Sequence, residues 1–171
     1  MNISEISVSP TTYRPAKFTD IPALLDLMTV AHFASSYAGK CRIDTAHAEK
    51  VLRSCIGNQG TEPREGQTLV YVAESDGLVV GAIIGILQRV YLVTDVLEAT
   101  DLFWFARPGA DPSVGPKLMR YLHKWASKIE HVIEIVQANR DTISDPDRTG
   151  KLIERTGARM VGHVYIKETG R

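Results

Sequence analysis

Apolar residues recur at helical spacing in the first third of the chain. Residues 19–34 carry one apolar face, which consists of Ile21, Leu24, Leu25, Met28 and Ala31. Either Thr19 or Asp20 can cap the start of this segment. Residues 44–56 show a second helical pattern that begins at Asp44, a residue type suited to the capping position. We therefore predict two helices before residue 60.

Two more helical segments lie in the second half of the chain. After residue 113, apolar residues repeat on one face at Val114, Leu118, Leu122, Trp125 and Ile129. Basic residues occupy the other faces of this segment. Residues 145–157 predict a shorter helix that stops at Gly157, because glycine readily adopts the backbone conformation that ends a helix.

Runs with strand propensity fill the intervals between these helices. Residues 68–75 and 78–93 are β-rich, and the Ser-Asp-Gly sequence at their junction predicts a hairpin turn. The remaining predicted strands are residues 12–18, 99–106, 131–139 and 158–168. An antiparallel meander that runs into a strand–helix–strand unit predicts an α/β fold of the α+β kind, with a mostly antiparallel mixed sheet and about four helices on its two faces.

Length and composition narrow the class of protein. The chain has 171 residues, no internal repeat and no evident linker, so we expect one domain over residues 1–171 with residues 1–11 as an N-terminal arm. Lys plus Arg equals Asp plus Glu, at 20 each, which does not favour nucleic acid or a membrane surface as a partner. The first residues lack the pattern of a signal peptide and no apolar run approaches the roughly 18 residues of a membrane span. We expect a cytoplasmic protein.

The sequence shows no pattern typical of a metal site, a disulfide framework or a catalytic nucleophile. Cys41 and Cys55 are too few for a disulfide framework and do not form a metal-type pair. The five histidines show no ligand spacing, so we predict no metal site. No P-loop, nucleophile elbow or dinucleotide fingerprint is present.

The loop over residues 107–113 allows two interpretations. Gly109 and Gly115 would let the backbone come close to a bound phosphate. The start of the following helix can stabilise such a phosphate, and Lys117 would add a positive charge. Against this, Pro112 and Pro116 lack N–H donors, and Asp111 places a negative charge at the same point. The alternative is a plain strand-to-helix turn in which Ser113 caps the helix.

The arrangement of the whole chain resembles the GNAT N-acetyltransferase superfamily. The resemblance extends from "YRPAKFTDIPALLDLM" through "VYVAESDGLVVGAIIG" and "DLFWFARPGADPSVGPKLMRYLHKWA" to "VIEIVQANRDT" and "LIERTGARMVGH". Within the family, the chain resembles members encoded by phages and prophages. The family's Gln/Arg-x-x-Gly-x-Gly/Ala loop corresponds to residues 110–115, where Gly115 is the position that matches well.

The resemblance implies acetyl-CoA, or another acyl-CoA, as co-substrate. In the family, backbone groups near the end of the fourth strand hold the pantetheine arm, and that stretch corresponds here to residues 105–107. The residues that the resemblance assigns to the coenzyme are Phe105, Ala106, Arg107, Ser113, Val114, Gly115, Lys117, Asn139 and Arg148. Asn139 is equally compatible with a turn that ends a strand, and Arg148 with a solvated residue at a helix start.

Two carboxylates are candidates for the base that deprotonates the amine. Asp101 lies within the strand that the resemblance makes the fourth, and under strict alternation it shares a face with Phe103 and Phe105. Burying an unpaired carboxylate there is costly, so Asp101 is a functional base, an ion-pair partner of a nearby arginine, or a strand-end residue that stays in water. Glu98 is the second candidate. The family's usual proton donor, a tyrosine, is replaced by Ile153.

His32 lies at the end of the first predicted helix and Tyr37 in the loop that follows it, where the resemblance places the acceptor amine. The function that these features favour is an N-acetyltransferase in which a small-molecule or peptide amine attacks the thioester directly. Two alternatives stay open: a GNAT-fold binding or assembly protein without chemistry, and a phage-type enzyme that modifies nucleic acid. An apolar strand over residues 78–87 and the N-terminal arm are compatible with a homodimer.

Overall fold

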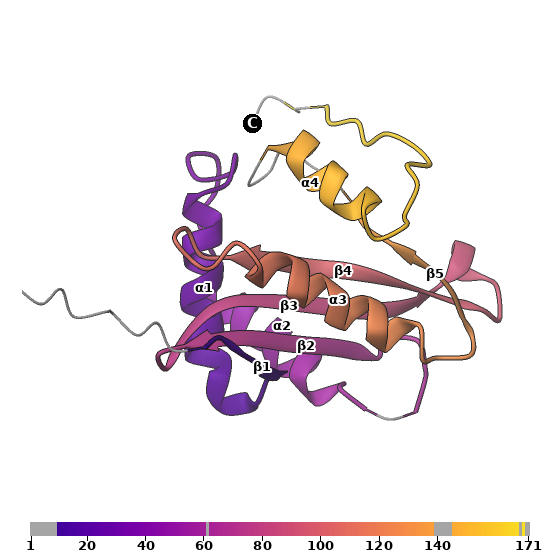
Figure 1. The fold of residues 1–171 in the computed structure, drawn as a ribbon, viewed down its shortest axis with the longest axis horizontal. Coiled ribbons are helices and arrows are strands. Elements are labelled where there is room, and N and C mark those ends of the chain that lie inside the picture. The colour runs from indigo at the N-terminus through magenta and orange to yellow at the C-terminus, as the bar shows by residue number, and fades with distance from the viewer. Residues whose placement is uncertain (1–9, 61, 139–144, 168, 170–171) are drawn as a thin grey trace, which may run out of the picture.

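A five-stranded mixed sheet forms the centre of the fold (Figure 1). The computed structural model describes residues 10–60, 62–138, 145–167 and 169. The strands lie in sequence order across the sheet: β1 Thr12–Pro15, β2 Thr68–Ser75, β3 Leu78–Arg89, β4 Leu97–Ala106 and β5 Val132–Val136. The first four strands pair antiparallel, and β5 pairs with β4 in parallel. The predicted mixed, mostly antiparallel sheet is confirmed.

Helices cover both faces of this sheet. They are α1 Ile21–Phe33, α2 Thr45–Gly57, α3 Val114–Ala126 and α4 Pro146–Glu154, with short 3₁₀ turns at Phe18–Asp20 and Val90–Leu92. In Figure 1, α3 crosses the front of the sheet, and α1 and α2 lie behind it. The core is divided accordingly: α1 and α2 pack on side chains such as Val72 and Ile84, and α3 packs on Leu69 and Ile83 from the opposite face.

Local sequence signals account for several element boundaries. The β2–β3 hairpin closes through Asp76 and Gly77, which have φ angles of 51° and 75°. Two positive φ values in a two-residue turn match the twist of the flanking strands, and Asp-Gly is a preferred pair for that geometry. Asp44 caps α2, since its carboxylate accepts a hydrogen bond of 2.9 Å from the His47 N–H. Both predictions are confirmed.

The cap predicted for α1 is wrong. Asp20 stands at the start of the helix, but its side chain makes no cap hydrogen bond there. Its carboxylate accepts instead from the Lys17 N–H at 2.7 Å and from both terminal nitrogens of Arg14 at 2.7 and 2.9 Å. A guanidinium offers two charge-assisted bonds in the fork geometry that fits a carboxylate, and these bonds direct the side chain toward β1.

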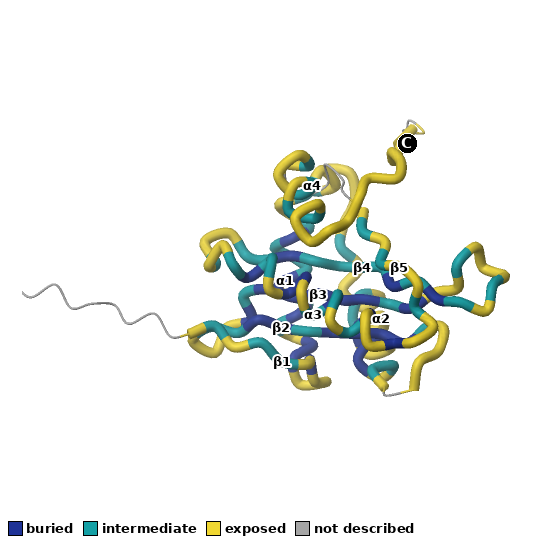
Figure 2. The backbone as a smooth tube through the Cα atoms, turned by 45° about the vertical axis from the view of Figure 1, so that its right-hand side comes forward, coloured by how far each residue is buried: buried dark blue, intermediate teal, exposed yellow. Residues whose placement is uncertain are grey.

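The last predicted strand is also wrong for the residues that the structure describes. Residues 158–167 contain no strand, and they lie exposed beyond α4 (Figure 2). Their large apolar side chains, Met160, Val161, Val164, Tyr165 and Ile166, are 54–89% exposed. A strand needs a hydrogen-bonding neighbour as well as a suitable composition, and this segment has none within the described chain.

Candidate active site

The two parallel strands, β4 and β5, are paired over only part of the length of β4. β4 pairs with β5 from Leu97, opposite Val132, to Thr100, opposite Val136. β5 ends there, whereas β4 continues for six residues to Ala106. Over that stretch, the edge of β4 that faced β5 has no strand partner in the described part of the chain. Backbone N–H and C=O groups on such an edge can bond an extended ligand that carries amides.

A β-bulge in β4 corrects the predicted orientation of Asp101. Ile84 of β3 lies opposite Phe103, and the next residue, Gly85, lies opposite Asp101, so Leu102 has no partner across the ladder. The extra residue shifts the alternation. Phe103 and Phe105 therefore pack into the α1 and α2 layer, whereas Asp101 shares its face with Ala99, which packs beneath the end of α3.

Asp101 lies in a polar pocket of three side chains at the point where β4 and β5 separate. His123 of α3 and Gln137, directly after β5, meet through Nε2 and Oε1 at 2.8 Å. Asp101 Oδ1 and Gln137 Nε2 are both buried and make no hydrogen bond within the described residues. Burial raises the pKa of the Asp101 carboxyl, and its own backbone N–H, the nearby Gln137 amide and the charge of His123 oppose that effect only in part.

The loop after β4 is anchored through Arg107. The Arg107 N–H donates to the Val80 carbonyl at 2.8 Å, and its Nε donates to the Val79 carbonyl at 2.9 Å. Its terminal nitrogen forms an ion pair with Asp26 of α1. These bonds tie the loop to both β3 and α1. Gly109 then turns the chain with a φ of 83°, a conformation that glycine adopts without strain.

The start of α3 is capped from within the loop. Ser113 stands at the cap position but makes no side-chain cap, so that part of the turn interpretation is wrong. The Asp111 carboxylate accepts from the Ser113 N–H at 2.7 Å, and the Val114 N–H donates to the Asp111 carbonyl at 2.9 Å. Hydrogen bonds from the Ser113 hydroxyl and N–H lower the pKa of the exposed Asp111. A carboxylate thus lies where a phosphate would bind.

Neighbouring residues of α3 face different surroundings. Val114 is fully buried against the sheet. Gly115 faces Trp104 of β4, whose indole nitrogen donates to the Gly115 carbonyl at 3.0 Å. Lys117 is exposed, and its ammonium lies 5.4 Å from the centre of the Tyr13 ring. Of these residues, Lys117 is the one with a free charge near the loop.

The other predicted site residues are spread over the structure. Phe105 is buried among the α1 side chains, and Ala106 is partly buried on the α3 face. The Glu98 carboxylate accepts a hydrogen bond from Gln88 across the ladder. Arg148 is exposed in the first turn of α4. Asn139 lies outside the described residues.

The structure does not bring the acceptor candidates together with Asp101. His32 is in the last turn of α1 and Tyr37 in the exposed loop that follows. Helix α1 packs on the face of the sheet opposite to the one that Asp101 occupies. His123 and Gln137, which do adjoin Asp101, were not predicted, because only the fold places their distant segments together.

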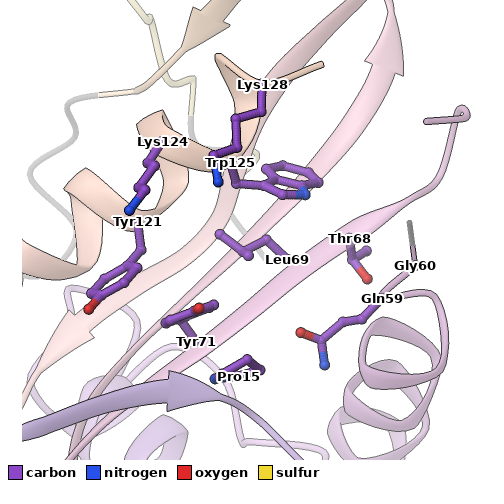
Figure 3. Close-up of a pocket in the computed structure, with 10 residues that line it drawn as sticks. All are labelled: Pro15, Gln59, Gly60, Thr68, Leu69, Tyr71, Tyr121, Lys124, Trp125 and Lys128. Carbon is purple, nitrogen blue, oxygen red and sulfur yellow. The ribbon is translucent and has the colours of Figure 1, made fainter. Parts of the chain in front are cut away.

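Two cavities in the described part of the chain lie away from the separation of β4 and β5. One, of about 510 Å³, lies between α3 and β2, with Tyr121 and Trp125 above and Leu69 and Tyr71 below (Figure 3). Its amide, Gln59, is already bonded to Ala16 and Val70. The other, of about 500 Å³, borders the outer side of the loop at Arg107–Asp111.

Within the described ranges, no group of three or more His, Cys, Asp or Glu side chains is placed to hold a metal ion. None of the described helices is both long and apolar enough to cross a membrane.

We compared this architecture with known proteins. No family model matches the chain, and no curated protein matches its sequence. Among solved structures, a predicted acetyltransferase from Clostridium acetobutylicum, solved with acetyl-CoA, is similar with a TM-score of 0.68 at 10% identity, over 93% of this chain and 96% of that one. The ribosomal-protein-alanine N-acetyltransferase from Brucella melitensis biovar Abortus 2308 gives 0.63 at 18% identity, over 92% and 98%.

A third similar structure is an aminoglycoside acetyltransferase from an uncultured soil metagenomic sample, in complex with sisomicin. It gives a TM-score of 0.62 at 15% identity and covers 93% of this chain and 97% of that one. At such identities, similarity establishes the fold. The chain therefore has the GNAT N-acetyltransferase fold, as its sequence predicted.

Proposed function

We propose that this protein is an acyl-CoA-dependent N-acyltransferase, with acetyl-CoA as the expected donor and a primary amine as the acceptor. The observation that carries the proposal is the unpaired edge of β4 beyond Thr100, which leads into the loop and the start of α3. An extended pantetheine arm has amides that suit a strand edge, and a helix N-terminus favours phosphate. In this fold the two features follow one another along the chain.

The coenzyme would be held mainly by backbone groups. We assign the pantetheine arm to the backbone of Phe105, Ala106 and Arg107, and the pyrophosphate to the start of α3 at Ser113, Val114 and Gly115. Lys117 would add a positive charge near the phosphates, with Asn139 and Arg148 as further contacts. Asp111 opposes this fit, since its carboxylate already accepts the Ser113 N–H.

The reaction we propose is direct attack by the amine on the thioester carbonyl. The cysteines support this over an acyl-enzyme, because Cys55 is buried in the α2 layer and Cys41 lies in the loop after α1. The amine must be neutral to attack, so a carboxylate takes its proton directly or through water. Glu98 and Asp101 are the candidates on β4, with His32 and Tyr37 proposed on the acceptor side.

A second candidate function is coenzyme or partner binding without chemistry. Two observations favour it: the Asp111 carboxylate at the start of α3, and Ile153 at the position of the family's tyrosine acid. The acyltransferase is expected to convert acetyl-CoA and an amine to products, whereas a binding protein is not.

The test is release of free CoA from acetyl-CoA in the presence of a panel of amines: an aminoglycoside, a polyamine, a free amino acid and a peptide with N-terminal alanine. The enzyme proposal expects release that depends on both protein and amine, with the acetylated amine detected by mass spectrometry. Intersecting lines in two-substrate kinetics would support a ternary complex, and parallel lines would indicate an acyl-enzyme instead. Coenzyme binding without acetylated product would favour the second candidate.

A further inference from the structure

The chemistry of the proposed function leaves one proton without a donor. When a thioester is cleaved, the departing sulfur carries a negative charge until it is protonated. The position that resembles the family's tyrosine acid holds Ile153, whose side chain has no proton to give. Water or another side chain must supply this proton, and the inference below therefore rests on the acyltransferase proposed above.

Geometry along β4 indicates where that donor must lie. Asp101 lies five strand residues before Ala106, which adjoins the loop, so the distance along β4 between them is about 17 Å. This is comparable with the length of an extended pantetheine arm. If the phosphates bind at the start of α3 and the arm follows the unpaired edge of β4, its sulfur end reaches the place where β4 and β5 separate. Asp101 and Gln137 border that place.

The surroundings of Asp101 favour the protonated form of its carboxyl group over the ionised form. Its Oδ1 is buried without a hydrogen bond within the described chain, while the residue as a whole keeps some exposure. Gly85 lies opposite it on β3 and brings no charge. From α3 the titratable group is His123, and from the end of β5 the neighbour is the uncharged Gln137. Among the described residues, no guanidinium or ammonium compensates an ionised carboxylate at this position.

We propose that Asp101 is the general acid that protonates the departing CoA sulfur. The amine nitrogen attacks the carbonyl carbon with its lone pair, and a carbon–nitrogen bond forms. The carbon–sulfur bond breaks, and its electron pair stays on sulfur. The Asp101 O–H proton then moves to sulfur, which gives the free thiol and the Asp101 carboxylate. The extra proton on nitrogen leaves to Glu98 or to water.

Gln137, held by His123, can hydrogen-bond Asp101 in either protonation state, and water returns the proton to the carboxylate after each turnover. With Asp101 ionised, the Gln137 amide N–H can donate to it while His123 donates to the Gln137 oxygen. With Asp101 protonated, the amide can turn over, accept from Asp101 and donate to His123. The first arrangement keeps the 2.8 Å contact between His123 Nε2 and Gln137 Oε1, with the histidine nitrogen as donor. The second replaces it with a bond from the turned amide to the other histidine tautomer. Gln137 is thus a positioning residue for Asp101.

The sign of the pH dependence tests this assignment. A general acid acts in its protonated form, so kcat of the wild type should fall as pH rises through the pKa of Asp101. Asp101→Asn should lose that descending limb and lower kcat by about 100-fold or more, with the KM for acetyl-CoA unchanged. Asp101→Glu should restore part of the rate. The matched control is Glu134→Gln, an exposed carboxylate on β5, which should leave kcat unchanged.

Two results would overturn the proposal. If kcat falls toward low pH and Asp101→Asn removes that limb, Asp101 is the base; if Asp101→Asn turns over like the wild type, it has neither role. A readout independent of turnover is the infrared band of a protonated carboxyl at neutral pH, expected in the wild type and absent in Asp101→Asn. Its absence from the wild type would also contradict the assignment. Failure of the wild type to bind acetyl-CoA would instead defeat the acyltransferase proposal itself.

Discussion

A single arginine near the start of the chain joins three segments of the fold. Arg14 of β1 donates to both oxygens of Asp20, at the start of α1, and to Glu74 of β2 at 2.7 Å. The Asp20 side chain is only 11% exposed. Because the carboxylate also accepts the Lys17 N–H, it satisfies a backbone donor as well as a charge. The bonds with Arg14 lower the pKa of Asp20.

Replacing this carboxylate should destabilise the protein in a pH-dependent way. Asp20→Asn keeps an acceptor for Lys17 but leaves Arg14 short of a charge, so we expect a loss of about 2 kcal/mol in unfolding free energy at neutral pH. Since the pKa of Asp20 is lowered by folding, its contribution is present above the unfolded pKa and is lost as pH falls through the folded pKa. Urea unfolding at several pH values measures the difference.

The control for this prediction is Asp95→Asn, which removes an exposed carboxylate in the turn before β4 and should change stability by less than about 0.5 kcal/mol. An equal stability of Asp20→Asn and wild type at neutral pH would show that the Arg14 contacts add nothing to the fold.

Asp111 affects ligand binding rather than the fold. Its carboxylate is exposed and occupies the N–H at the start of α3, so it repels a phosphate that approaches the same group. Asp111→Asn keeps the acceptor and removes the charge. Removing a like charge from beside the phosphates should make CoA binding a few-fold tighter. Calorimetric titration at low and high salt should show the gain and its reduction by screening. Unchanged or weaker binding would mean that the phosphates lie elsewhere.

Individual residues were predictable where their partner is local. Asp44 caps α2 by accepting a hydrogen bond from an N–H three residues further along the chain. Donor and acceptor are so close in the sequence that the cap can be predicted from it. The Asp20 carboxylate, by contrast, bonds to Arg14 of β1 and does not cap the start of α1. The face of Asp101 depends on an extra residue, Leu102, whose position is set by pairing with β3. Counting alternate residues cannot detect such a bulge.

At the scale of elements, α3 lies so close to the sheet that glycine is required beneath it. A Cβ added at Gly81 of β3 would lie 2.7 Å from Val114 Cγ1 and 3.1 Å from the Phe105 carbonyl oxygen. One of these neighbours is a fully buried side chain and the other is backbone, so neither can move without displacing α3 or β4. The close approach positions the start of α3 over the end of β4, where we propose that the coenzyme binds.

Gly81→Ala should therefore destabilise the protein by about 1–3 kcal/mol through overpacking. It should also weaken CoA binding, because α3 must shift away from β4. The matched control is Gly39→Ala, at a position with no atom within 4 Å of the added Cβ. Chemical denaturation measures the stability of both variants. A Gly81→Ala protein as stable as the control would contradict the close packing of α3 on β3.

Element types were largely predictable, because periodicity and turn residues are local properties. The hairpin at Asp76 and Gly77 is one example, since a two-residue Asp-Gly turn has one favoured geometry. Residues 158–167 are the counterexample. Their composition is that of a strand, yet strand formation depends on an edge to pair with, which composition does not reveal.

At the scale of the whole molecule, chain order determines where a site can form. The first four strands run antiparallel and in order, and the crossover through α3 makes β5 parallel to β4. Because β5 stops after Val136, the end of β4 next to the helix start has no strand partner on that side within the described residues. The order of elements was enough to predict this fold. The Asp101, His123 and Gln137 pocket was not predictable, because it joins three elements that only the folded chain brings together.

Coenzyme binding tests the central proposal most directly. The melting temperature should rise with acetyl-CoA, because a ligand that binds the native state stabilises it in proportion to the logarithm of its concentration. At a hundredfold excess over Kd, the gain of about 2.7 kcal/mol corresponds to a shift of about 5–10 °C for a protein of this size. Asp111→Asn should shift further at the same concentration. An unchanged melting temperature at millimolar acetyl-CoA would contradict the proposal that this GNAT fold binds acyl-CoA.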